Sequence, residues 1–422
     1  MEANIQFINN NLIKPNSKIL SNSKKPKKKS KKKTNNVKID KAIDNNRNEN
    51  IPKTIKVRNP GIDLIRLICM YGIVINHILF WQIKKGGKYE RYSKQLKILD
   101  IIFYWHNDGF ALISGIVGYK TNKYSNLLYL WLCVFFYSVS IHFYFLKFIR
   151  NPIIKDSINV EYFPIIYIRY WYFTAYFGMY LILPVINKGI SILTKYELRL
   201  VVISTLGIYV FWRRIKNPIN DVFHLMRGFS TFWLLILYIT GAYIGKYRVD
   251  YTGIKKLIYC LICLFIFFYT TFLFYKSIYI GFGNINGYYK RKIIELLYLM
   301  LNEDLDSPIR IIQSLSITLF LLQIKYNKYL SKIISFFGQL TFGVYLLHIN
   351  ILVDHNIIPK LFMNDPNNLS SNSTIILFLV KTLKVYSICI LIDFLRHLIF
   401  TILRIRKICI FLEKIVIKIF SF

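Results

Sequence analysis

Apolar stretches recur along this chain at lengths that suit a lipid bilayer. The first runs from Gly61 to Trp81 and reads GIDLIRLICMYGIVINHILFW. At about 1.5 Å per residue, a helix of this length crosses a hydrocarbon core of about 30 Å. With 54% apolar and 17% aromatic residues, the chain has the composition of a protein whose apolar runs are covered by lipid. We therefore predict an all-α fold, a polytopic bundle of transmembrane helices.

Ten candidate spans follow from the hydropathy pattern. An even number places both termini on the same side of the membrane, and the basic segments at the two ends indicate the cytoplasmic side. The first loop expected outside, KKGGKYERYSKQLK, is also basic, so the orientation depends on the two ends. We predict a multi-pass integral membrane protein with both termini in the cytoplasm. The spans lie at about 62–82, 98–119, 126–148, 168–187, 198–213, 229–247, 256–275, 308–324, 334–353 and 374–399.

Three parts of the chain differ in composition. Residues 1–56 are rich in lysine and asparagine and lack the apolar core of a signal peptide, so we expect a disordered cytoplasmic tail. Residues 57–405 form the expected membrane domain, and residues 406–422 a basic amphipathic segment. The net charge of +36 would suggest a nucleic-acid partner in a soluble protein. Consecutive membrane spans leave no room for a nucleic-acid recognition fold, so we expect no such partner.

Ionisable residues stand inside the first span, where they are rare and usually functional. Asp63, Arg66 and His77 all lie in this stretch. At about 100° per residue, the eleven-residue spacing returns Arg66 and His77 to within about 20° of the same helix face, about 16 Å apart along the axis. This arrangement suits a long ligand that is held at one point and reacts at another. In the alternative interpretation, Asp63 and Arg66 reach the membrane boundary and His77 only packs.

Polar and small residues mark other spans as well. In HNDGFALISGIVGYK, small residues such as Ser114 and Gly115 permit close helix approach, and His106 and Asp108 lie at the polar start of the span. His348 stands in the middle of the ninth span. Of these positions, Ser114 and His348 are candidates for a site within the membrane.

Several other features favour structural interpretations. We expect His142, among aromatic residues, to be interfacial and not catalytic. Cys260 and Cys263 form a CxxC within an apolar helix that offers no further ligands, so we expect core filling and no metal site. Glycosylation sequons at Asn368 and Asn372 lie on the side expected to be external.

Five motifs, in order between about residues 57 and 405, resemble those of the acyltransferase-3 family. Members are integral membrane enzymes that move acyl groups from acyl-CoA to sugars and other acceptors. The amino-acid sequences of the second and third motifs are similar to those of surface-polysaccharide O-acetyltransferases. No appended esterase-like domain with a GDS-type motif is visible. The motifs are the Asp63-Leu-x-Arg66 start with His77 at R-x10-H spacing, FALISG, WYFTAYFGMYLILPVIN, FGQLTFGVYLLH and IDFLR.

The resemblance implies an O-acyltransferase that depends on acyl-CoA. Acetyl is the group expected, and the acceptor is expected to be a hydroxyl of a sugar, a glycan or a lipid-linked saccharide. Acyl-CoA is then a co-substrate, membrane lipids surround the protein, and no metal is expected.

The same resemblance implies roles for the matched residues. His77 is expected to be the general base that takes the hydroxyl proton. Arg66 is expected to hold the phosphates of CoA as a bidentate guanidinium. His348 is expected to be a second acid–base group or a positioning group, with a structural role as the equal alternative. Ser114 is expected to hydrogen-bond the thioester or only to pack, with an acyl-enzyme on its hydroxyl as the less favoured variant.

The remaining motif residues complete the expected site. Asp63, Trp171 and Tyr345 are expected to contact the substrate, and Asp393 and Arg396, three residues apart, to form a structural pair.

Two other classes of function compete with this interpretation. A transporter or flippase of lipid-linked saccharides would also use charges within the membrane as a substrate pathway. Many transporters contain inverted repeats, and we find no convincing similarity between the two halves of this chain. A non-enzymatic scaffold would leave His77 and His348 unexplained.

Overall fold

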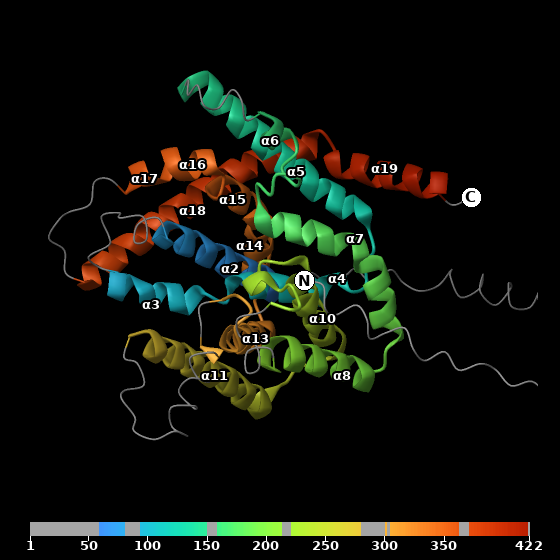
Figure 1. The fold of residues 1–422 in the computed structure, drawn as a ribbon, viewed down its shortest axis with the longest axis vertical. Coiled ribbons are helices and arrows are strands. Elements are labelled where there is room, and N and C mark those ends of the chain that lie inside the picture. The colour runs from blue at the N-terminus through green and yellow to red at the C-terminus, as the bar shows by residue number, and fades with distance from the viewer. Residues whose placement is uncertain are drawn as a thin grey trace, which may run out of the picture. The chain divides into compact units, whose positions relative to one another are not determined.

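The computed structural model describes residues 59–80, 93–149, 158–212, 221–279, 300–301, 304–362 and 371–420 (Figure 1). Every regular element within these residues is a helix, as predicted. The N-terminal tail predicted for residues 1–56 and the sequon at Asn368 lie outside the described residues.

Six helical segments of the described residues are long and apolar enough to cross a membrane. They are α2 (Pro60–Leu79), α5 (Tyr124–Tyr144), α7 (Trp171–Ile192), α11 (Gly253–Tyr279), the consecutive pair α14 (Lys328–Gly338) and α15 (Thr341–His348), and α18 (Ser371–Ile402). These segments indicate an integral membrane protein, in agreement with the hydropathy pattern.

The other four predicted spans coincide with shorter or interrupted helices. Residues 98–119 form α3 (Ser93–Phe103) and α4 (His106–Gly118), and residues 198–213 form α8 (Lys195–Thr205) and the π-helical η5 (Leu206–Trp212). Residues 229–247 and 308–324 form α10 (Thr231–Tyr247) and α13 (Pro308–Gln323). α10 is largely buried by its neighbours, so its apolar composition serves protein packing as much as contact with lipid. The count of ten spans stays a prediction.

The smaller elements connect these helices. They are η3 (Phe145–Ile149), α6 (Ile158–Tyr162), η6 (Met226–Gly228), α16 (Ile351–Asn356) and α17 (Ile358–Leu361), and the chain ends in α19 (Ile405–Phe420).

Helix α2 lies at the centre of the packing. It contacts α3, α4, α13, α14, α15 and α18, and Figure 1 shows it beside α18. Its start is set locally, because the Asn59 side chain accepts a hydrogen bond from the Gly61 amide at 2.9 Å and Pro60 occupies the first helical position. The helix that carries Arg66 and His77 therefore has neighbours on most of its sides.

Helices α4 and α10 approach each other at glycines. A Cβ atom at Gly115 would lie 2.8 Å from the backbone nitrogen of Ala242, and one at Gly241 would lie 2.8 Å from the carbonyl carbon of Leu112. Both separations are shorter than real Cβ contacts, so only glycine fits at these positions. The close approach predicted from the small residues of the second span is confirmed, and its partner is α10.

Candidate active site

One cavity brings together most of the residues predicted to act on substrate. It has a volume of about 370 Å³ and lies between α2, α4, α5, α7, α15, α18 and α19. Arg66, His77, Ser114, Trp171 and Tyr345 all line it. Arg66 and His77 therefore face one space, as their eleven-residue spacing predicts.

His77 contacts His348 at the inner part of this site. Nδ1 of His77 lies 3.1 Å from Nε2 of His348, and Nδ1 of His348 lies 2.6 Å from the Val344 carbonyl oxygen. The His348 side chain is fully buried, whereas His77 retains some exposure to the cavity. The sequence places these two residues 271 positions apart, and α2 and α15 bring them into hydrogen-bond distance.

The hydrogen-bond network decides which nitrogen of each ring carries the proton. A carbonyl oxygen only accepts, so Nδ1 of His348 must donate to Val344. In a neutral ring this leaves Nε2 of His348 as the acceptor, and Nδ1 of His77 must then donate to it. In neutral His77 the Nε2 atom consequently carries no proton and can accept one. This is the tautomer that a general base requires, with its orientation held by a second ring.

Arg66 is held by Asp63 one turn earlier on α2. The two side chains form an ion pair at 2.5 Å, in which Asp63 is 0% exposed and Arg66 26% exposed. Gly338 packs closely on Asp63, where a Cβ atom would lie 2.7 Å from the Asp63 Cβ. Asp63 is not among the residues that line the cavity. The substrate contact expected of Asp63 stays a prediction. In the structure its carboxylate forms an ion pair with Arg66.

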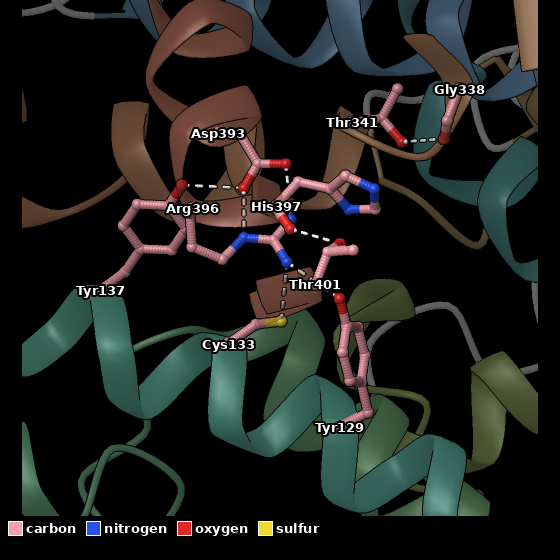
Figure 2. A network of polar contacts seen from close by, with 9 residues as sticks. All are labelled: Tyr129, Cys133, Tyr137, Gly338, Thr341, Asp393, Arg396, His397 and Thr401. Atoms are coloured by element: carbon pink, nitrogen blue, oxygen red, sulfur yellow. Dashed lines mark hydrogen bonds and ion pairs between the residues drawn. The ribbon is translucent and has the colours of Figure 1, made fainter. Parts of the chain in front are cut away.

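A second acid–arginine pair lies on α18. Asp393 accepts hydrogen bonds from Nε and Nη2 of Arg396 at 2.8 and 2.7 Å and from the Tyr137 hydroxyl at 2.8 Å (Figure 2). Arg396 also donates through Nη1 to the Tyr129 hydroxyl at 3.0 Å. Asp393 sits against Gly343, where any Cβ atom would overlap the carboxylate. The predicted structural pair forms, and its arginine also lines the cavity.

Two tyrosines of the cavity wall have buried hydroxyls. Tyr172 and Tyr345 line the cavity, their rings lie 6.4 Å apart, and neither hydroxyl forms a hydrogen bond within the described part of the chain. Buried polar groups are usually satisfied, so these two hydroxyls are unusual in lacking such a bond. Tyr172 belongs to a matched motif but received no role in the sequence analysis. Trp171 lines the wall beside it and packs on Phe229.

Ser114 uses its proton within its own helix. Its Oγ donates to the Phe110 carbonyl oxygen at 2.8 Å, a common arrangement for serine inside a helix. Among the described residues no histidine bonds to this hydroxyl. The geometry therefore offers no base that would activate Ser114 as a nucleophile.

A second cavity of about 570 Å³ lies behind the histidine pair. Its wall is almost entirely apolar and comes from α5, α15, α16, α17 and α18. His348 and Arg396 line this second cavity, and Arg396 also lines the first. His77 lines the first cavity, so the contact between the two histidines lies between the two cavities.

Polar residues of the second span are used in packing. Asn76 Nδ2 lies 3.0 Å from Nε2 of His106, and the Trp233 indole donates to Asp108 at 3.2 Å. Neither His106 nor Asp108 lines either cavity. These contacts join α2, α4 and α10 next to the site.

The other residues considered in the sequence lie apart from the site. His142 is buried within α5 and lines neither cavity. Cys260 and Cys263 are unpaired in α11. Within the described ranges no group of three or more His, Cys, Asp or Glu side chains is placed to hold a metal ion.

Comparison with known proteins identifies the family. A family model described as an acyltransferase domain, of the acyltransferase-3 family, matches residues 59–394, most of the chain. No curated protein and no solved structure matches. The matched range contains the histidine pair, Arg66 and both unpartnered tyrosines. The chain therefore belongs to the acyltransferase-3 family and is a membrane acyltransferase.

Proposed function

We propose that this membrane acyltransferase moves an acyl group, with acetyl as the expected group, from acyl-CoA to a hydroxyl of a sugar or glycan. The observation that carries the proposal is the His77–His348 pair, which leaves Nε2 of His77 bare in a cavity that Arg66 also lines. The donor, the acetyl group and the saccharide acceptor come from the resemblance of the motifs to those of surface-polysaccharide O-acetyltransferases.

The chemistry proceeds in one transfer step with a tetrahedral intermediate. Nε2 of His77 takes the proton of the acceptor hydroxyl while its oxygen attacks the thioester carbonyl carbon. The new C–O bond forms, and the carbonyl oxygen becomes an oxyanion. The C–S bond then breaks, and the imidazolium of His77 returns its proton to the leaving thiolate, so that the products are the ester and CoA. His348 keeps the ring in position, because its Nε2 accepts from Nδ1 of His77 throughout.

The oxyanion needs hydrogen-bond donors in place before the reaction. The Tyr172 and Tyr345 side chains line the same cavity, and their hydroxyls, buried and without partners among the described residues, would take this role once the side chains turn toward the thioester. Donors that are positioned in advance are usually a large source of rate enhancement in acyl transfer.

Arg66 supplies a cation at a distance from the reacting centre. It stands eleven residues before His77 on one helix, which places the two about 16 Å apart along the axis. The pantetheine arm of CoA is the part of the donor that would bridge this separation. Asp63 orients the guanidinium through the 2.5 Å ion pair.

The test uses purified protein in nanodiscs with acetyl-CoA and a panel of sugars and glycans. We expect release of CoA that depends on an acceptor, together with a product heavier by one acetyl group in mass spectrometry. Cell glycans from strains with and without the protein identify the natural acceptor. If acetyl-CoA stays intact with every acceptor while a saccharide crosses the membrane of sealed vesicles, the transporter interpretation replaces this one.

A further inference from the structure

The last helix of the chain contributes to the cavity, although it lies beyond the matched family range. Arg406, in the first turn of α19, lines the cavity that contains Arg66 and His77. The family model ends at residue 394. Neither the family match nor the motifs therefore give Arg406 a role.

The fold holds α19 in place at this point. The chain turns sharply between α18 and α19 at Arg404, whose φ is 53°, and Cys409 is fully buried. α19 packs along α5, as Figure 1 also shows. The Arg406 guanidinium lies 4.9 Å from the centre of the Tyr129 ring, a cation–π contact that holds it against α5.

Arg406 differs from the other two arginines of the cavity in lacking an acidic partner among the described residues. Arg66 is paired with Asp63, and Arg396 is paired with Asp393. Arg406 forms no ion pair within the described part of the chain, and no acidic residue lines the cavity there. An anion is therefore the ligand that this wall of the cavity would attract.

The position of Arg406 is at the open side of the cavity. Arg406 is exposed, and so are two polar lining residues, Asn126 and Gln339. His77 and Tyr345 are less exposed and line the same space from within. A ligand that enters from this side meets Arg406 before it reaches His77.

We propose that Arg406 binds the phosphate groups of the acyl-CoA donor, and that α19 is thereby part of the donor site. The proposal rests on the proposed function for the identity of the donor. A guanidinium has five N–H donors, so Arg406 can contact the Tyr129 ring and still donate to phosphate oxygens. Arg66 then serves the part of the donor that lies deeper in the cavity.

The deciding experiment measures binding and does not require turnover. Isothermal titration compares CoA with pantetheine, which has the same thiol arm and no phosphate, on wild type and on Arg406→Gln in neutral phosphatidylcholine nanodiscs. We expect Arg406→Gln to weaken CoA binding about tenfold or more, since a charge-assisted hydrogen bond contributes about that factor. Pantetheine binding should be unchanged, which also shows that the variant is folded.

The control is Lys407→Gln, which removes the same charge from the next residue of α19. Lys407 is exposed and does not line the cavity, so CoA binding should stay at the wild-type level. Arg406→Lys keeps the charge but loses the planar fork, and we expect an intermediate affinity.

A lipid headgroup could supply the same phosphate chemistry, and the lipid composition separates the two sources. If Arg406→Gln changes CoA affinity only in nanodiscs that contain phosphatidylglycerol, Arg406 binds lipid and the inference is wrong. Equal CoA affinity for wild type and Arg406→Gln in both lipids also overturns it. CoA binding that depends on Arg406 without any acyl transfer would leave this inference standing and overturn the proposed function alone. Wild type that binds no CoA overturns both.

Discussion

At the scale of single residues, the contact between His77 and His348 decides how the proposed base is prepared. The Val344 carbonyl sets the tautomer of His348, and His348 in turn sets that of His77. The ring of His77 is thus oriented by another imidazole and not by a carboxylate. Both imidazoles stay in fixed positions because α15 packs directly on α2.

Substitution of the two histidines should separate their roles. His77→Ala removes the base and should lower kcat by roughly 10²–10⁴ while CoA still binds. His348→Leu removes one hydrogen bond to the base and should lower kcat by about 10- to 100-fold. His348→Gln offers an amide oxygen that can accept from Nδ1 of His77, so it should recover part of the loss. Steady-state kinetics in nanodiscs checks this order, and wild-type turnover by His77→Ala would refute the assignment.

Arg66 should act on donor binding more than on the chemical step. In Arg66→Lys a point charge replaces a planar fork, so we expect a higher KM for acyl-CoA with little change in kcat. The matched control is Arg169→Lys, because Arg169 is also paired with a buried acid, Glu161, but lines neither cavity. Normal acyl-CoA binding by Arg66→Lys would place the donor at other cations of the cavity.

At the scale of elements, the glycine contacts between α4 and α10 hold one wall of the site. Gly115 follows Ser114 directly, and α10 approaches at that point with Gly241 and Gly245. The Ser-Gly pair of the second motif therefore combines a residue that faces the cavity with one that permits helix contact. The glycine of this pair is thus explained by packing, and the thioester contact expected of Ser114 stays a prediction.

Alanine at two glycines should have opposite effects on stability. Gly115→Ala places a methyl group against the α10 backbone, so we expect destabilisation by about 1–3 kcal/mol. Gly189 in α7 has nothing within 4 Å of a Cβ atom, so Gly189→Ala should be neutral or stabilise by up to about 1 kcal/mol. Thermal unfolding in detergent measures both. Equal midpoints for the two variants would show that α10 can move away at little cost.

At the scale of the whole molecule, two arginine pairs contribute their arginines to one cavity. Asp63–Arg66 on α2 and Asp393–Arg396 on α18 both have three-residue spacing, and each carboxylate packs against a glycine of the α14–α15 segment. The segment that supplies His348 thus also covers both buried acids. The histidine pair and both charge pairs therefore depend on α2, α18 and the α14–α15 segment.

Reporter fusions test the predicted membrane topology. We predict ten spans and cytoplasmic termini, whereas six segments of the described residues meet the length and apolarity of a span. Reporter fusions after Lys56 and after Phe422 should both report the cytoplasm. Fusions within the connections on either side of α10 and α13 test the shorter helices, because a true span places its two flanks on opposite sides. Opposite signals from the two termini would contradict an even number of spans.

Much of the architecture could be predicted from the sequence alone. Hydropathy indicates membrane helices because a bilayer tolerates only elements that satisfy their own backbone hydrogen bonds. Helical periodicity alone placed Arg66 and His77 on one face, and both line one cavity. The order of five motifs led to the family, which the family model confirms. These features are local or depend only on order along the chain.

The contacts that prepare the site were decided by the tertiary structure. No periodicity relates His77 to His348, because they lie on helices that meet only when α2 packs on α15. The burial of Asp63 under Gly338 and the entry of Arg406 into the cavity likewise depend on how α14 and α19 pack. The sequence determined which groups are present and on which helices they lie. Helix packing decided which of them meet, because side chains far apart in sequence come into contact only through the fold.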